Sequence, residues 1–268
     1  MPDVWSRVAE LDVAAQERLA AVLETRGADP QQQGMRRAFL GDIRFPAEAR
    51  VLEVGCGTGV MSRMLARLPA IGSVTGVDPA RSLLVKARSL AADLPHLSFK
   101  EADGRSLPFD DKSFDAVIFD STLSHVPGPE QALRQAARVL KPLGWLGVFD
   151  GDYATATVAV GEHDPLQACA EAMMAGSVHD RWLVRRLPAL VRLCRLDLVG
   201  FRSHGFVDAI EPTYMLTVVD RGADLLSQQG LIGTDLAAAL KAEGRRRAAE
   251  GTFYGQIAYA HLVARKPG

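Results

Sequence analysis

The 268-residue sequence has few cysteines and aromatic residues, no excess charge of one sign and no long apolar run. Its three cysteines, Cys56, Cys169 and Cys194, lie far apart without CxxC or Cys/His spacing, which excludes a disulfide framework and a zinc site. The formal net charge of -1 gives no overall attraction for nucleic acid. No stretch approaches the roughly 20 apolar residues that a membrane-spanning helix requires. We therefore expect a reduced, cytoplasmic protein that binds neither nucleic acid nor a metal ion and does not span a membrane.

The middle of the sequence alternates short apolar runs with longer amphipathic patterns. Five β-rich runs bounded by Gly, Pro, Asp or Ser predict strands at 51–54, 74–77, 97–101, 116–119 and 146–149. Apolar residues at helical spacing predict helices over 58–68, 79–90 and 129–140 between them. Strands that alternate with helices form βαβ units, so the sequence predicts an α/β fold with a parallel sheet covered on its faces.

The length is within reach of one elaborated domain, so we expect a single domain over 1–268 with a helical lid. Residues 1–40 are expected to form a helical preface, 41–150 the core and 151–251 helical insertions with one strand near 199–207. The insertions include predicted helices over 180–196 and on each side of 230–234. Residues 252–268 are expected to contain a final strand.

The stretch VLEVGCGTG, residues 51–59, places Gly55, Gly57 and Gly59 directly after a predicted strand and before a predicted helix. Glycine reaches backbone conformations that are closed to other residues, and a helix N-terminus favours an anionic group. A dinucleotide-binding turn has the spacing G-x-G-x-x-G, but the third position here is Val60. The turn therefore favours a small anionic ligand other than a pyrophosphate.

Four motifs in order give this sequence a family resemblance. VLEVGCGTG, VTGVDPA, EADGRSLPFDDKSFDAVIFDSTLSHV and RVLKPLGWLGVFD resemble the motifs of class I methyltransferases dependent on S-adenosylmethionine (SAM). The small-molecule group that includes the quinone-biosynthesis C-methyltransferases is the most similar. The resemblance covers residues 36–150 and, more loosely, the C-terminal segment. It implies a Rossmann-like, doubly wound and mostly parallel sheet of seven strands, with helices on both faces and an antiparallel C-terminal strand.

The resemblance also implies a cofactor site for SAM and its product S-adenosylhomocysteine (SAH), without a metal. Asp78, after the second strand, is expected to accept hydrogen bonds from the ribose hydroxyls, although it could simply cap the next helix. Asp103 is expected to accept from the adenine amino group, although it could be an ordinary turn residue. The other expected cofactor contacts are Glu53, Gly55, Cys56, Gly57, Thr58 and Gly59 at the methionine part, Arg36 or Arg37 at its carboxylate, Pro79, Leu83 and Gly104 nearby, and Asp120 and Ser121 beside the transferred methyl.

Methyl transfer from a sulfonium mainly requires alignment and exclusion of water, so a general base is optional. His125 follows the fourth strand and titrates near neutrality, which makes it a candidate to take or guide a proton, or merely to bind substrate. Expected acceptor contacts are Tyr153, Trp182, Tyr214 and Tyr254, any of which could equally be a core residue.

Three other functions compete with a small-molecule SAM methyltransferase. They are a methyltransferase that acts on a macromolecule, a SAM-binding regulator or partner subunit without turnover, and a dehydrogenase. The sequence leaves open the acceptor, whether C, O or N is methylated, and whether the chain is a monomer or a homodimer.

Overall fold

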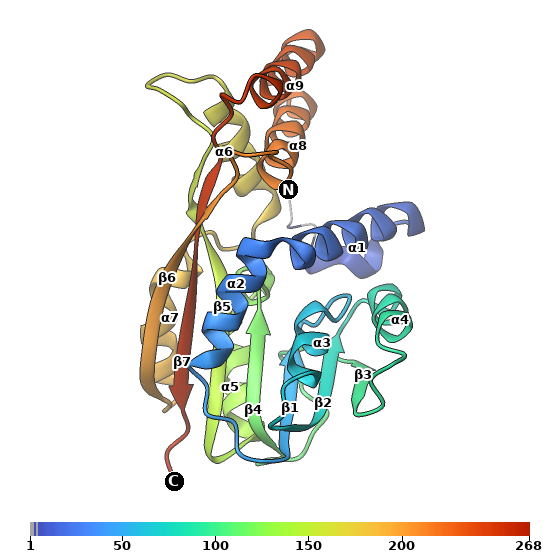
Figure 1. Ribbon diagram of the computed structural model, residues 1–268, viewed down its shortest axis with the longest axis vertical. Helices are drawn as coiled ribbons and strands as arrows, with labels where there is room; N and C mark the ends of the chain where they lie inside the picture. The colour runs from blue at the N-terminus through green and yellow to red at the C-terminus, as the bar shows by residue number, and fades with distance from the viewer. Residues whose placement is uncertain (1–2, 4) are drawn as a thin grey trace.

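The computed structural model of the protein describes residue 3 and residues 5–268. A seven-stranded sheet runs through the molecule in the order β3-β2-β1-β4-β5-β7-β6 (Figure 1). The strands are β1 (Ala49–Val54), β2 (Ile71–Asp78), β3 (Leu97–Glu101), β4 (Phe114–Asp120), β5 (Leu140–Thr157), β6 (Asp197–Val207) and β7 (Gln256–Arg265). The pairs among β1 to β5 are parallel, whereas β7 is antiparallel to both β5 and β6. The expected doubly wound α/β fold is confirmed.

Helices cover both faces of the sheet. They are α1 (Val13–Ala28), α2 (Pro30–Gly41), α3 (Val60–Ala66), α4 (Arg81–Leu90), α5 (Pro129–Val139), α6 (Leu166–Ser177), α7 (Leu183–Leu193), α8 (Tyr214–Gln228) and α9 (Thr234–Ala249), with short turns η1 (Trp5–Glu10) and η2 (Leu123–His125). Side chains alternate between the faces along β1, so Val51 joins the core beneath α2 and α3 while Leu52 joins the core beneath α5 and α7. Each central strand is therefore apolar on both sides, as the continuous apolar run VLEV requires.

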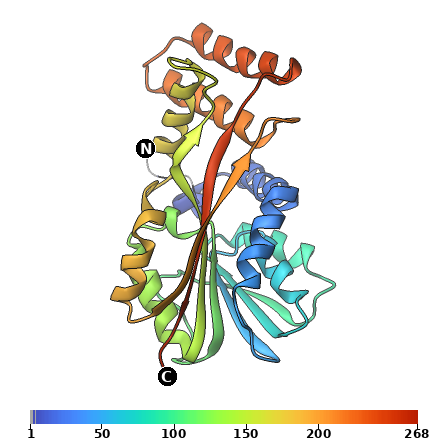
Figure 2. The same cartoon turned by 60° about the vertical axis from the view of Figure 1, so that its left-hand side comes forward.

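The strand expected over 146–149 is much longer than its apolar run. β5 extends from Leu140 to Thr157 because β7, far away in the sequence, pairs with its second half as far as Thr157 opposite Gln256. The register is irregular between Asp152 and Thr157, where the two strands rise beyond the rest of the sheet (Figure 2). A partner strand from the C-terminal region thus stabilises a segment whose own composition gives a weak strand pattern.

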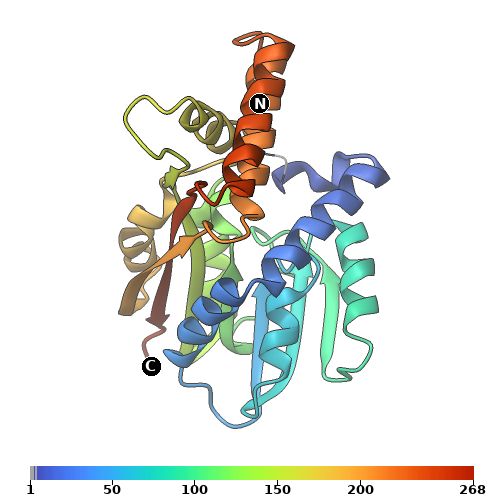
Figure 3. The same cartoon turned by 45° about the horizontal axis from the view of Figure 1, so that its top comes forward.

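The N-terminal preface consists of two helices rather than one continuous segment. Asp29 ends α1 and also begins α2, where its carboxylate accepts a hydrogen bond from the backbone N–H of Gln32 at 2.9 Å. Pro30 follows as the first residue of α2, a position at which its missing N–H costs nothing. The change of direction sends α2 along the sheet and leaves α1 over the ends of β1 and β2 (Figure 3).

Helices α6, α8 and α9 lie together above the carboxyl ends of the parallel strands (Figures 1 and 3). The expected pair of helices around 230–234 is α8 and α9, the helix expected over 180–196 is α7, and the strand expected near 199–207 is β6. Within residue 3 and residues 5–268, no helix has the length and apolar character needed to cross a membrane.

The packing of α8 on α6 depends on a glycine. A Cβ atom at Gly222 would lie 1.9 Å from the carbonyl oxygen of Cys169, a backbone atom that a rotamer change cannot move. We predict that Gly222→Ala lowers the free energy of unfolding by about 2 kcal/mol, because overpacking outweighs the better helix propensity of alanine. The matched control is Gly244→Ala in α9, whose added Cβ would find its nearest neighbour at 3.4 Å. Chemical denaturation of both variants checks this, and equal stabilities would contradict it.

Candidate functional site

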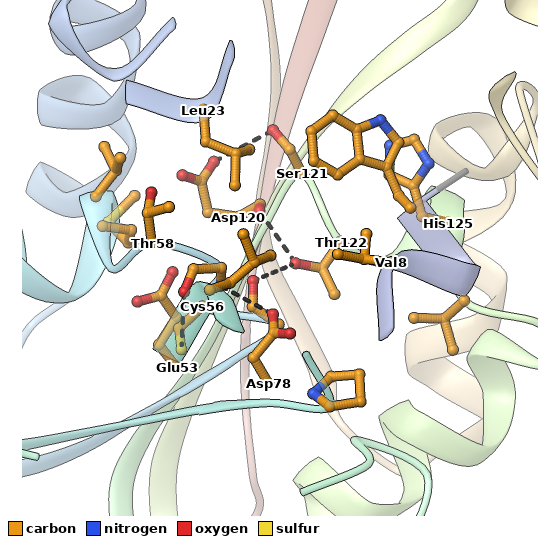
Figure 4. Close-up of a pocket in the computed structure, with 18 of the residues that line it drawn as sticks. Val8, Leu23, Glu53, Cys56, Thr58, Asp78, Asp120, Ser121, Thr122 and His125 are labelled. Carbon is orange, nitrogen blue, oxygen red and sulfur yellow. Dashed lines mark hydrogen bonds between the residues drawn. The ribbon is translucent and has the colours of Figure 1, made fainter. Parts of the chain in front are cut away.

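A cavity at the carboxyl ends of β1, β2 and β4 gathers most of the residues expected at the cofactor (Figure 4). We call it the main cavity. Its walls come from η1, α1, α2, the β1–α3 turn, and the segments after β2, β3 and β4. The expected residues that line it are Arg36, Glu53, Gly55, Cys56, Gly57, Thr58, Asp78, Pro79, Leu83, Asp103, Asp120, Ser121 and His125.

The glycine turn after β1 has the backbone that its sequence requires. Gly55, Gly57 and Gly59 have φ values of +74°, +52° and +79°, all in the left-handed region. The turn is held against β2, since the N–H groups of Gly55 and Cys56 both donate to the carbonyl of Val77, at 2.8 and 3.0 Å. A Cβ at Gly55 would lie 2.2 Å from the Thr122 side chain, so the turn after β1 fits closely against the turn after β4.

Asp78 lies at the end of β2 and is 8% exposed. Its Oδ2 accepts from the Gly57 N–H at 2.9 Å, and its Oδ1 accepts from the Ala80 N–H at 2.8 Å. Burial raises the pKa of this carboxyl to about 6, and the two backbone hydrogen bonds oppose the shift. Asp78 is not the N-cap of the next helix as the alternative expected, because α4 begins at Arg81 with Ala80 as its N-cap residue and has no side-chain cap. Its bond to Ala80 closes a turn before α4, and its bond to Gly57 couples the carboxylate to the glycine turn.

Asp103 lines the main cavity and forms an ion pair with Arg105, which the sequence did not predict. The Arg105 guanidinium donates to both carboxylate oxygens, at 2.7 Å from Nη2 to Oδ2 and at 3.1 Å from Nε to Oδ1. Hydrogen bonding from Arg105 holds the pKa of Asp103 below its ordinary value. Because the Asp103 side chain is 45% exposed, this pair is a weak contribution to stability.

A buried ion pair joins α2 to the end of β4. Arg36 Nε lies 2.8 Å from Asp120 Oδ2, and the two side chains are only 5% and 7% exposed. The Arg36 guanidinium also lies 5.5 Å from the centre of the Phe149 ring. Glu53, nearby on β1, accepts from the Ser62 hydroxyl, and burial raises the pKa of its carboxyl to about 8. Burial thus disfavours the charged form of Glu53, and the ion-pair partner of Arg36 is Asp120.

His125 lies in η2, directly after the β4 turn, and its two ring nitrogens have different surroundings. Nδ1 is 2.6 Å from Asp3 Oδ2, while Nε2 is 3.5 Å from the Tyr153 hydroxyl. Asp3 also accepts from the backbone N–H of His179 at 2.8 Å, which attaches the N-terminal segment to the segment before α7. Trp5 lies against the imidazole with a ring separation of 6.1 Å and lines the main cavity. The N-terminal segment thus both lines the main cavity, through Trp5, and contacts His125, through Asp3 and Trp5.

Several expected residues lie elsewhere. Gly59 and Gly104 are absent from the cavity lining, and each makes room for packing instead, because an added Cβ would meet Phe99 at 2.8 Å and Val54 at 2.6 Å respectively. Arg37 is exposed on α2 and does not line the main cavity. Among the expected acceptor contacts, Tyr153 packs beneath His125, Tyr214 lines a separate cavity, and the partly exposed Trp182 and Tyr254 line neither.

Four residues of the N-terminal preface line the main cavity although the sequence did not predict them there, namely Trp5, Val8, Leu23 and Arg26. A signal existed for two of them. Leu23 and Arg26 follow the buried Leu19 at helical spacing, so they share the face of α1 that points at the sheet. Because α1 lies far from the glycine turn in the sequence, the spacing alone does not show that this face covers the cavity.

Comparisons with known proteins agree with this geometry. Residues 52–148 match the family model described as a methyltransferase domain. Over 129 residues the chain is 37% identical to a demethylmenaquinone methyltransferase of Tropheryma whipplei, covering 48% of this chain and 53% of that protein. Over 115 residues it is 39% identical to a ubiquinone biosynthesis O-methyltransferase of Albidiferax ferrireducens, covering 42% and 45%. The chain thus spans about half the length of the curated relatives it matches.

A solved structure extends the likeness of the fold beyond the matched segment. The crystal structure of a putative methyltransferase from Bacillus halodurans superposes with a TM-score of 0.63 at 19% identity, covering 87% of this chain and 98% of that one. At this identity the likeness concerns the fold alone. Residues 52–148 thus resemble a methyltransferase domain, and most of the chain has the fold of a solved methyltransferase structure.

Proposed function

We propose that the main cavity binds SAM and that the protein transfers its methyl group to a small-molecule acceptor. The observation that carries the proposal is the junction of Gly55, Gly57 and Asp78, where a left-handed glycine turn and a buried carboxylate meet at the ends of two adjacent strands. An acidic oxygen pair at this position suits a ribose diol, and the turn leaves room for a ligand close to the backbone. The relatives are named as methyltransferases of quinone biosynthesis, which supports a small acceptor.

Buried polar atoms around the cavity fit the charged and polar groups of SAM. Thr58 Oγ1 and Arg36 Nη1 are both buried without a hydrogen-bond partner, although each residue lines the cavity. Such atoms cost free energy unless a ligand or water satisfies them. In the proposed complex, Arg36 Nη1 and the glycine turn hold the methionine end, Asp78 holds the ribose and Asp103 lies at the adenine end. SAM itself supplies an activated methyl group on a sulfonium.

The chain's own residues would enclose and orient the acceptor. Trp5, Val8 and Leu23 form an apolar cover over the cavity, which excludes water from the transfer. His125 faces the same cavity, and the contact with Asp3 fixes the orientation of its imidazole. Held in this way, the ring can take a proton from an acceptor hydroxyl or amine as the methyl bond forms. The enclosed space favours a small acceptor over a macromolecule.

The first test is ligand binding. We predict that SAH binds the purified protein in calorimetry and raises its melting temperature, whereas NAD does neither.

We further predict that Asp78→Asn weakens SAH binding about tenfold or more at pH 7.5, because the amide loses charge-assisted hydrogen bonds to the diol. The matched control is Asp93→Asn, at an exposed aspartate that does not line the main cavity. Absence of SAH binding to the wild-type protein would exclude the proposed function.

The same carboxyl predicts a pH dependence. Since the pKa of Asp78 in the free protein is about 6, a bound diol that needs the ionised form competes with protonation below that pH. The affinity for SAH should therefore be constant above pH 7 and fall as the pH drops through 6, by up to about tenfold per unit. Asp78→Asn should remove this dependence. A wild-type affinity that stays flat from pH 5 to 8 would reject the assignment.

The role of His125 is tested by turnover. In assays of SAH release with small phenols, catechols and amines, His125→Ala should lower kcat about a hundredfold for an acceptor that must lose a proton. Asp3→Asn should give a smaller loss, because it acts through the orientation of the ring. His163→Ala, at a side chain that is 89% exposed, is the matched control. Both active-site variants should bind SAH normally, and a His125→Ala enzyme with unchanged kcat from pH 6 to 9 would remove His125 from proton transfer.

A further inference from the structure

A second cavity lies beside the main cavity, between the N-terminal helices and α8. Its volume is about 180 Å³, and its walls come from α1, α2, the end of β6 and the first turn of α8. Arg26 lines both cavities and separates them. The exposed residues Ala21 and Thr25 line the second cavity on its outer side, so it opens to solvent between α1 and α8.

Arg26 is a buried cation without a carboxylate partner among the residues that the structure describes. Its residue exposure is 9%, its Nη2 donates to Ser121 Oγ at 3.1 Å, and its Nε has no hydrogen-bond partner. The other two arginines of the main cavity are paired, Arg36 with Asp120 and Arg105 with Asp103. A buried guanidinium is costly unless an anion balances it. Among the three arginines of the main cavity, Arg26 is therefore the one that would bind an added anion most strongly.

Gln32 provides a second buried group at the same place. It is 1% exposed, it lines the second cavity, and neither its Nε2 nor its Oε1 has a hydrogen-bond partner. An amide buried in this way leaves one donor group and one acceptor unsatisfied, which destabilises the protein unless a ligand or water supplies partners. The backbone N–H of Gln32 is bonded to Asp29, which leaves the side chain as the available part.

Aromatic rings surround these polar groups. The Arg26 guanidinium lies 5.5 Å from the centre of the Tyr214 ring, and Phe206 meets Tyr214 edge to face with ring centres 5.9 Å apart. Phe206 and Tyr214 both line the second cavity. Since a cavity of about 150 Å³ can hold a benzene ring, the second cavity has room for one six-membered ring. The charged and amide side chains of the lining are those of Arg26, Gln32 and Asp29, and the Asp29 carboxylate already accepts from the Gln32 backbone N–H. The Arg26 guanidinium and the Gln32 amide beside an aromatic wall suit an amphipathic planar ligand.

We infer that the second cavity is the acceptor-binding site and that it selects a ring compound with an anionic oxygen, either a carboxylate or a phenolate. The oxyanion accepts from Arg26 Nε and Gln32 Nε2, the ring packs against Phe206 and Tyr214, and the atom to be methylated reaches past Arg26 into the main cavity. The identification of this ligand as the methyl acceptor rests on the proposed function, whereas its anionic, ring-containing chemistry rests on the second cavity alone.

The test uses the full-length protein saturated with SAH and three probes of similar size. Benzoate carries a carboxylate, 4-nitrophenolate at pH 8.5 carries a phenolate, and benzamide is the neutral counterpart of benzoate. We expect at least one of the anions to bind at least about tenfold more tightly than benzamide in calorimetry, because a hydrogen bond to a charged group is stronger than a neutral one. The preferred anion shows whether a carboxylate or a phenolate is the natural group.

Two variants locate the probe. At saturating SAH, Arg26→Met should weaken binding of the preferred anion at least about tenfold. Gln32→Leu, at a residue that lines only the second cavity, should weaken it less and keep the affinity for SAH within about threefold of wild type. Arg37→Met is the matched control, because Arg37 is exposed on α2 and lines neither cavity. If circular dichroism shows that Arg26→Met does not fold, Arg26→Lys, which keeps the positive charge, replaces it in the test.

The outcomes separate this inference from the proposed function. Equal binding of benzamide and the anions, or an anion affinity that Arg26→Met and Arg26→Lys leave unchanged, overturns the inference while SAH binding still supports the cofactor site. Loss of SAH affinity in Arg26→Met, with anion binding at saturating SAH unchanged, assigns Arg26 to the cofactor and also overturns it. If SAH does not bind the wild-type protein, the proposed function fails, and the probes titrated without SAH still test the second cavity.

Discussion

The attachment of the β1–α3 turn to the end of β2 determines the rest of the site. Two N–H groups of the turn donate to the Val77 carbonyl, and a third, from Gly57, donates to the Asp78 carboxylate. These bonds hold the ends of two adjacent parallel strands together, so the glycine turn and the acidic side chain act as one rigid unit. The three left-handed glycines allow the turn to pass this close to β2.

Burial of charge gives this rigid unit its chemistry. Removal from water raises the pKa of Asp78 to about 6 and that of Glu53 to about 8, so these two carboxyls differ in charge near neutrality. Asp120 remains the partner of Arg36, while Arg26 has none among the described residues. The site therefore contains charges that are already balanced inside the protein and one that a ligand can balance. That difference separates Arg36, whose charge is balanced within the protein, from Arg26, whose charge an added ligand can balance.

The N-terminal segment supplies much of what lies above the sheet. Asp3 contacts His125, Trp5 and Leu23 cover the main cavity, and Arg26 stands between the two cavities. These groups come from chain that precedes the matched segment 52–148. The strand ends and the added N-terminal helices thus line the two cavities together, and segments outside the sheet are where specificity is carried in folds of this kind.

Local sequence alone determined the first strand, the glycine turn and the position of Asp78. The apolar run before Gly55, the spacing of the three glycines and an acid directly after the second strand predict the strand, the turn and the position of Asp78, because backbone sterics and side-chain alternation act over a few residues. Tertiary structure alone decided the length of β5, which depends on pairing with β7, and the meeting of Asp3 with His125, which are 122 residues apart. It also decided that Arg36 meets Asp120 while Arg26 has no carboxylate partner among the described residues. Helical spacing places Arg26 on the inner face of α1, but charge pairing depends on which distant segments pack together, and no local pattern encodes that.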